Sequence, residues 1–151
     1  MAQPLVGSRI IIAAWVGNVL FAATVVPVAL GADSLRGVSI GMCLGLFAVS
    51  LVVWTWAFGI ALARTARGDD VVVGSLFLVQ GPVPSAVRWH LFGALAVCLA
   101  ITAATAASEP FGVLVPMLPL GFAGLWGARY GTFPPRRTGG PARRTSGRRG
   151  A

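Results

Sequence analysis

Charged residues divide this chain into four apolar stretches, and no formally charged residue lies inside any of them. A helix needs about 20 predominantly apolar residues to cross the roughly 30 Å hydrocarbon core of a bilayer. Each stretch reaches about that length. The pattern therefore predicts an all-α membrane domain over residues 1–128, a bundle of four transmembrane helices with spans at about 10–30, 37–63, 89–107 and 110–128.

The first stretch has an alternative interpretation as a cleaved signal peptide. Arg9 precedes it, and Ala29-Leu30-Gly31 resembles a small-residue cleavage site. A signal peptide has an apolar core of about 7 to 15 residues, and this stretch is longer. Its length favours a retained helix, and the later spans keep the same orientation in both cases.

The composition excludes an ordinary soluble domain. Only 11% of the residues are charged, whereas soluble domains have about 25%. The formal net charge is +8, and most of it comes from residues 129–151, which carry seven arginines and no acid. Because this segment combines Arg with Pro, Gly, Ser and Thr and has no apolar periodicity, we expect it to be a disordered tail.

The arginines predict how the chain is threaded. Loops on the cytoplasmic side of a membrane are enriched in Lys and Arg. With four spans, one side of the membrane receives both termini and every arginine except Arg36, namely Arg9, Arg64, Arg67, Arg88 and those of the tail. We therefore expect a multi-pass protein of the plasma membrane with cytoplasmic N- and C-termini.

One apolar segment is too short to span. Val71 to Val79 lies between Asp69-Asp70 and Gly81-Pro82. It fits a segment packed at the membrane interface, a short hairpin or a re-entrant segment. Backbone at membrane depth is tolerated only when it is buried in protein or lines water, so the re-entrant alternative would indicate a cavity.

Small residues recur at helical spacing in three spans. Helices in lipid associate through close backbone approach and interhelical hydrogen bonds, so these repeats predict helix-packing faces, either within the chain or towards a second copy or partner. Asn18, the strongly polar side chain near the middle of a span, is expected to form an interhelical hydrogen bond. The packing residues are Gly37, Gly41, Gly45, Ala96, Ala100, Ala104, Gly121, Gly124 and Gly127.

The fourth span carries three prolines, Pro110, Pro116 and Pro119. Proline removes a backbone donor and crowds the preceding turn, so we expect the first half of this span to be kinked or partly unwound. Unwound backbone is also a feature of transporter binding sites.

No pattern predicts catalysis, a metal site or a cofactor. Cys43 and Cys98 match no ligand spacing, and the lone His90 has no second ligand nearby in the sequence. We expect Glu109 to end the third span in a short loop and Asp69-Asp70 to be solvated loop charges. The sequence therefore predicts no enzyme.

Three arginine pairs in the tail suggest a partner for it. Each basic residue near an anionic leaflet contributes about 1 kcal/mol of attraction, so anionic inner-leaflet lipids are the favoured partner. An acidic protein is an alternative, and nucleic acid is the least favoured because the tail has one phenylalanine and no folded reader. The residues are Arg136, Arg137, Arg143, Arg144, Arg148 and Arg149.

The end of the chain, FGVLVPMLPLGFAGLWGARYGTFPPRR (Phe111 to Arg137), resembles the ends of small uncharacterised integral membrane proteins of actinobacteria. The resemblance implies a plasma-membrane location and carries no activity, substrate or residue role.

Two functions fit these observations. A non-enzymatic scaffold or accessory subunit of a membrane complex is favoured by the small-residue faces, the absence of charge inside the spans and the basic tail. The alternative, a small transporter or channel for a neutral or hydrophobic compound, is favoured by the proline-rich fourth span and the Val71 to Val79 segment.

Overall fold

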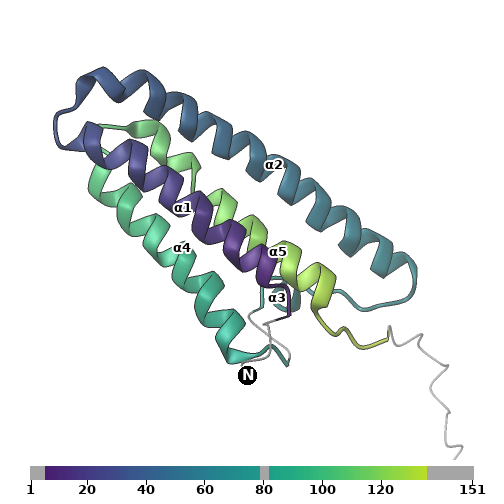
Figure 1. Cartoon of the computed structure of the whole chain (residues 1–151). Helices are drawn as coiled ribbons and strands as arrows, with labels where there is room; N and C mark the ends of the chain where they lie inside the picture. The colour runs from purple at the N-terminus through teal and green to yellow at the C-terminus, as the bar shows by residue number, and fades with distance from the viewer. Residues whose placement is uncertain (1–5, 79–81, 136–151) are drawn as a thin grey trace, which may run out of the picture.

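The computed structural model of the chain describes residues 6–78 and 82–135, and it is an all-α bundle of four long helices, as the sequence predicts (Figure 1). All four are long and apolar enough to cross a membrane. By helix length and hydropathy the chain is therefore a multi-pass membrane protein. Its elements are α1 (Ser8–Ala29), η1 (Asp33–Leu35), α2 (Arg36–Ala66), α3 (Val73–Leu76), α4 (Ser85–Thr105), η2 (Pro110–Leu114) and α5 (Met117–Tyr130).

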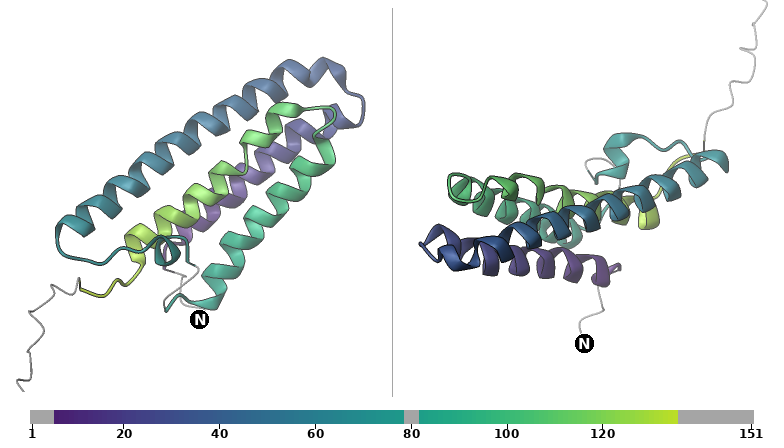
Figure 2. Two further views of the ribbon diagram at one scale, coloured as in Figure 1. Left: turned by 180° about the vertical axis from the view of Figure 1, so that it is seen from behind. Right: turned by 90° about the horizontal axis from the view of Figure 1, so that it is seen from above.

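Successive spans run in opposite directions, so the bundle has two distinct ends (Figures 1 and 2). The termini end holds Ser8, Ala66, Ser85 and Tyr130; the far end holds the α1–α2 and α4–η2 connections. Helix α1 packs between α2 and α4, and α5 has its most extensive interface with α2.

The fourth span is the central one. Within the most apolar part of each span, 61% of the fourth span's residues are buried inside the protein, against about 30% for each of the other three. The other spans each bury one stripe of residues three or four positions apart, such as Asn18, Phe21 and Val25 on α1, the spacing of one helix face. Their remaining faces are apolar and exposed, which is the arrangement expected of helices surrounded by lipid.

The first part of the fourth span is not α-helical, which agrees with the break that its prolines predict. It begins as the 3-10 helix η2, and α5 starts only after Pro116. Pro119 falls in the first turn of α5, where its missing N–H leaves no hydrogen bond unmade. The break therefore lies where the two prolines remove the fewest backbone hydrogen bonds.

The segment that is too short to span packs against the bundle. Residues 73–76 form the single turn of α3, which lies against α5 at the termini end. Leu76 and Leu78 are buried, and Leu78 has a φ of 62°, a left-handed conformation that ends the turn. Of the three interpretations of this segment, packing at the end of the bundle agrees with the described residues; Val79 lies outside them.

Several helix boundaries differ from the predicted ones by a few residues; α4, for example, begins at Ser85 rather than at residue 89. Helix α2 continues to Ala66, and α5 continues to Tyr130, so Arg129 belongs to the bundle rather than to the tail. Residues beyond α5 also make defined contacts, since the Asp70 N–H donates to the Pro134 carbonyl at 2.9 Å. The fourth span therefore ends two residues after the predicted boundary at residue 128.

Candidate functional site

The glycines of α5 are buried and make room for bulky neighbours. A Cβ at Gly121 would lie 2.9 Å from Trp54 of α2, and one at Gly124 would lie 3.0 Å from Phe77. A Cβ at Gly127 would overlap the backbone carbonyl of Leu76. These glycines therefore serve packing within the chain, chiefly by accepting the segment around α3.

Two aromatic rings cover this glycine surface. Trp54 and Phe77 pack together with ring centroids 5.4 Å apart, and the Trp54 indole N–H donates to the Met117 carbonyl at 2.9 Å. Aromatic pairs of this geometry add stability beyond the area that they bury. Helix α2, the α3 segment and α5 are thereby joined at one place.

The other small-residue repeats face outward. The three glycines of α2, Gly37, Gly41 and Gly45, are exposed, and nothing within the chain lies within 4 Å of a Cβ built on any of them. Ala96, Ala100 and Ala104 of α4 are exposed as well. Packing within the chain is therefore the wrong interpretation for these six residues. Each of the two helices is rotated so that its polar and larger apolar residues face the bundle, and the small residues therefore face away from it.

Asn18 is buried and joins two spans. Its side-chain amide donates to the backbone carbonyl of Ala94 at 2.7 Å, linking α1 to α4. This is the kind of interhelical contact expected of the residue, and it satisfies a polar group that would otherwise be costly inside the bundle.

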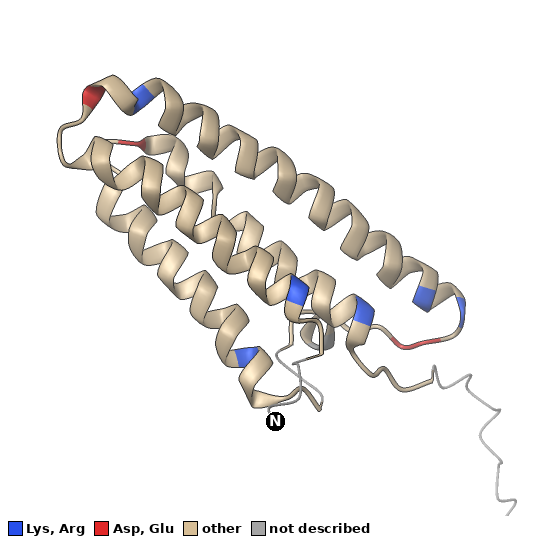
Figure 3. Ribbon diagram, in the orientation of Figure 1, with Lys and Arg blue, Asp and Glu red and all other residues tan. Residues whose placement is uncertain are grey.

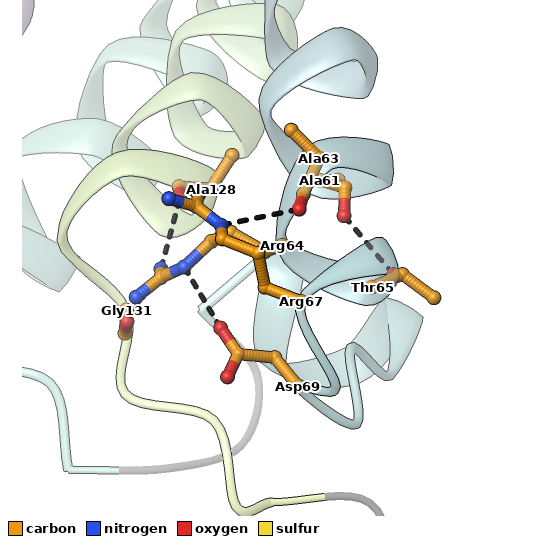
Figure 4. Close-up of polar contacts among 8 residues, drawn as sticks. All are labelled: Ala61, Ala63, Arg64, Thr65, Arg67, Asp69, Ala128 and Gly131. Atoms are coloured by element: carbon orange, nitrogen blue, oxygen red, sulfur yellow. Dashed lines mark hydrogen bonds and ion pairs between the residues drawn. The ribbon is translucent and has the colours of Figure 1, made fainter.

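A cluster around Arg64 joins three segments at the termini end (Figure 4). The Arg64 guanidinium donates to the carbonyls of Ala128 and Gly131 at 2.9 and 2.8 Å and pairs with Asp69 at 3.2 Å. A cation at these carbonyls complements the negative end of the α5 dipole. Asp69 is therefore an ion-pair partner, which corrects its interpretation as a solvated loop charge. Sequence reasoning missed the cluster because the two carbonyls that Arg64 binds are 64 and 67 residues away from it in the chain.

The charged residues divide unequally between the two ends (Figure 3). At the far end the one described arginine is Arg36, and it pairs with Asp33 at 2.7 Å. The termini end carries the other described arginines, Arg9, Arg64, Arg67, Arg88 and Arg129, with Asp69 and Asp70.

Glu109 lies in the short connection after the third span, where the sequence predicts it, but its side chain is buried. It follows the end of α4 and precedes η2, and only 1% of its surface is exposed. The side chain is buried because η2 packs against α2 and α4 at the far end.

The remaining candidates do not form a site in the described residues. His90 is exposed, and Cys43 and Cys98 are buried free thiols. Within residues 6–78 and 82–135, no three His, Cys, Asp or Glu side chains are grouped to hold a metal ion. The tail residues Arg136, Arg137, Arg143, Arg144, Arg148 and Arg149 lie outside the described residues.

The resemblance of Phe111 to Arg137 to actinobacterial membrane proteins stays a prediction. No protein-family model, curated protein or solved structure matches this chain.

Proposed function

We propose that the protein is a non-enzymatic subunit of a membrane assembly and that it associates through the α2 glycine face, formed by Gly37, Gly41 and Gly45. The observation that carries this proposal is that three glycines at four-residue spacing are exposed along one helix with no neighbour inside the chain. Another helix has room to approach there.

The physics of helix association in lipid supports this face. Lipid tails are as apolar as leucine, so burial from water does not drive association, and close backbone approach does. Glycine at every fourth position allows the closest approach, whereas the alanines of α4 hold a neighbour one methyl group further away. Because a glycine repeat is complementary to itself, α2 of a second copy is the occupant that we propose, with two-fold symmetry.

Cross-linking tests this proposal on the full chain in lipid vesicles. Gly41→Cys should give a disulfide-linked dimer on mild oxidation. Val26→Cys is the matched control, since it is also exposed and also near the far end, but on α1. Equal cross-linking of the two variants, or a strictly monomeric protein in both detergent and vesicles, contradicts the proposal.

The charge distribution supports a proposed orientation. We place the termini end in the cytoplasm, because five described arginines gather there while the far-end Arg36 is neutralised by Asp33. The arginine pairs of the tail would then face the anionic inner leaflet of the plasma membrane. A topology reporter fused after Ala151 should report the cytoplasm, and one inserted between Gly31 and Asp33 should report the outside; an external signal at Ala151 would overturn this orientation.

A small transporter or channel is the second candidate. The break between η2 and α5 favours it, because irregular backbone at a broken helix is where transporters bind their substrates. Cysteine scanning across residues 110–120 decides between the two. A water-soluble thiol reagent should label one face of this segment if it lines a pathway, and complete protection argues against transport.

A further inference from the structure

A shallow groove lies on the outer surface of the bundle between α1 and α4. Apolar side chains of α1, from Ile11 to Leu20, and His90 of α4 line this α1–α4 groove. Its volume is about 490 Å³, within the range of ligand sites in proteins. Val16 and Val19 in its wall are 51% and 63% exposed. The α1–α4 groove therefore opens towards the surrounding lipid and not into the bundle.

Contacts between α1 and α4 fix the shape of the groove. The two helices run side by side in the same direction (Figure 1), and the Asn18 side chain donates to the Ala94 carbonyl at 2.7 Å. The Trp15 ring lies 4.0 Å from the position of a Cβ at Gly93, which is ordinary van der Waals contact. Trp15 is partly buried and packs against the core, and Ile11 is buried. These two side chains therefore form the floor of the groove.

The groove has the length of one leaflet. From Ile11 to Leu20 its wall is about 14 Å long at the rise of an α-helix. The hydrocarbon core of a bilayer is about 30 Å thick, so one leaflet contributes about 15 Å. Because α1 begins at Ser8, the groove starts at the termini end and stops near the bilayer midplane. A lipid acyl chain fits this length, whereas a transmembrane helix of a partner would continue through both leaflets.

A basic side chain lies at the mouth of the groove. Arg9 is exposed and precedes Ile12 by three positions, so the two residues share one face of α1. Long side chains on a helix lean towards its N-terminus, and arginine keeps its charged group at the water interface. The Arg9 guanidinium therefore reaches the headgroup layer above the groove. Neither α1 nor α4 contains an acidic residue, so this charge has no partner on the two helices that form the groove.

We propose that the α1–α4 groove binds one anionic phospholipid from the leaflet at the termini end. In this site the phosphate lies at Arg9, whose guanidinium matches two phosphate oxygens, and one acyl chain lies along the groove. His90 in the wall can donate a ring N–H to an ester oxygen of the same lipid. An anionic headgroup is favoured over a zwitterionic one, because α1 and α4 have no acidic side chain to pair with a headgroup ammonium. The site is independent of the α2 glycine face, which lies on another helix.

Photo-crosslinking tests this proposal on the full chain in phosphatidylcholine vesicles. The probes are phosphatidylglycerol and phosphatidylcholine with the same diazirine-bearing acyl chain, which loses nitrogen on irradiation and inserts into a nearby bond. Mass spectrometry counts adducts on residues 11–20 and on Leu51, Val52 and Trp56, which are exposed on α2. The ratio of phosphatidylglycerol to phosphatidylcholine adducts should be about fivefold higher on α1 than on α2, the preference that about 1 kcal/mol of attraction gives. Equal ratios on the two helices overturn the proposal.

Two arginines at the termini end supply a matched pair of variants. Arg9→Gln and Arg88→Gln each remove one positive charge from an exposed position, but Arg88 lines a separate hollow with Trp89 and Phe92. Arg9→Gln should remove the preference of the α1 residues for phosphatidylglycerol, and Arg88→Gln should leave it unchanged. Equal losses in the two variants would show a general attraction between charges and overturn the proposal.

Native mass spectrometry measures the acyl-chain contact without cross-linking. The unaltered protein, released from vesicles that contain phosphatidylglycerol, should retain a single molecule of this lipid per chain. Val19→Trp places a large ring in the groove and should abolish retention. Val52→Trp is the matched control, because Val52 is 64% exposed against 63% for Val19 but lies on α2, and it should keep the lipid. Equal retention in the two variants, or no retained lipid in the unaltered protein, overturns the proposal.

Discussion

The glycines of α5 and those of α2 have similar spacing and opposite surroundings. Gly121, Gly124 and Gly127 of α5 lie under Trp54, Phe77 and the Leu76 backbone, whereas nothing covers the α2 glycine face. The comparison shows that the spacing of small residues identifies a helix face that another segment can approach closely. Whether a segment of the same chain packs on that face depends on how many elements surround the helix. Helix α5 is central and α2 is peripheral.

The largest effect is expected at Gly127. In Gly127→Ala the new methyl group meets the backbone carbonyl of Leu76, which has no flexible end to move aside. We expect a loss of about 3 kcal/mol in the free energy of unfolding, at the upper end for an overpacked core. Chemical denaturation in detergent micelles measures it.

Gly59→Ala is the matched control for that variant. Gly59 is exposed on α2, and nothing lies within 4 Å of a Cβ there. The substitution should be neutral or stabilising by up to about 1 kcal/mol, because alanine favours the helix. Similar losses in the two variants would mean that α3 does not pack on α5.

A smaller loss is expected at Gly121. The methyl group of Gly121→Ala meets the Trp54 side chain, which can shift, but the shift weakens the Trp54 hydrogen bond to Met117. We expect a loss of about 1.5 kcal/mol. Trp54→Phe, which removes the bond and keeps an aromatic ring, should account for about 1 kcal/mol of it in a double-mutant cycle. Fully additive losses would show that the two residues act separately.

Gly41→Leu should leave folding nearly unchanged and weaken association. The residue is exposed and has no neighbour in the chain, so we expect a change in unfolding free energy within about 0.5 kcal/mol. The proposed dimer should dissociate about tenfold more readily, because a leucine prevents close helix approach. Energy transfer between labelled copies in vesicles measures this, and an unchanged dimer would exclude the α2 glycine face.

The smallest effect is expected on α4. Ala100→Leu alters an exposed small residue in the other outward repeat. We expect changes within about 0.5 kcal/mol in stability and within twofold in association. If this variant and not Gly41→Leu disrupts the dimer, the interface lies on α4, and the distinction between glycine and alanine faces is wrong.

Much of the fold follows from the sequence because charges and prolines have local effects. The four spans end close to charged residues, and Pro116 and Pro119 place the break in the fourth span. The spacing of Gly124 and Gly127 likewise predicts a packing face. It does not reveal the occupant, since the residues that fill it belong to a short segment that crosses no membrane.

The candidate sites were less predictable, because they depend on contacts between distant segments. From the sequence, Arg64 is predicted only to mark the end of a span; its hydrogen bonds to the end of α5 are visible only in the structure. The burial of Glu109 could not be predicted from the sequence, because it depends on how η2 packs across the far end. The prolines predict a break in the helix but not how the segment before it packs.

The fit of α3 to α5 also sets an order of events during synthesis. Leu76 and Phe77 leave the ribosome before α4, whereas Gly124 and Gly127, which receive them, emerge with the last helix. Trp54 of α2 is already present to meet Phe77, but the α5 glycines are absent until the fourth span is made. Docking on α5 therefore cannot precede synthesis of the fourth span, and a chain that ends before Gly121 lacks the glycine surface on which Leu76 and Phe77 pack.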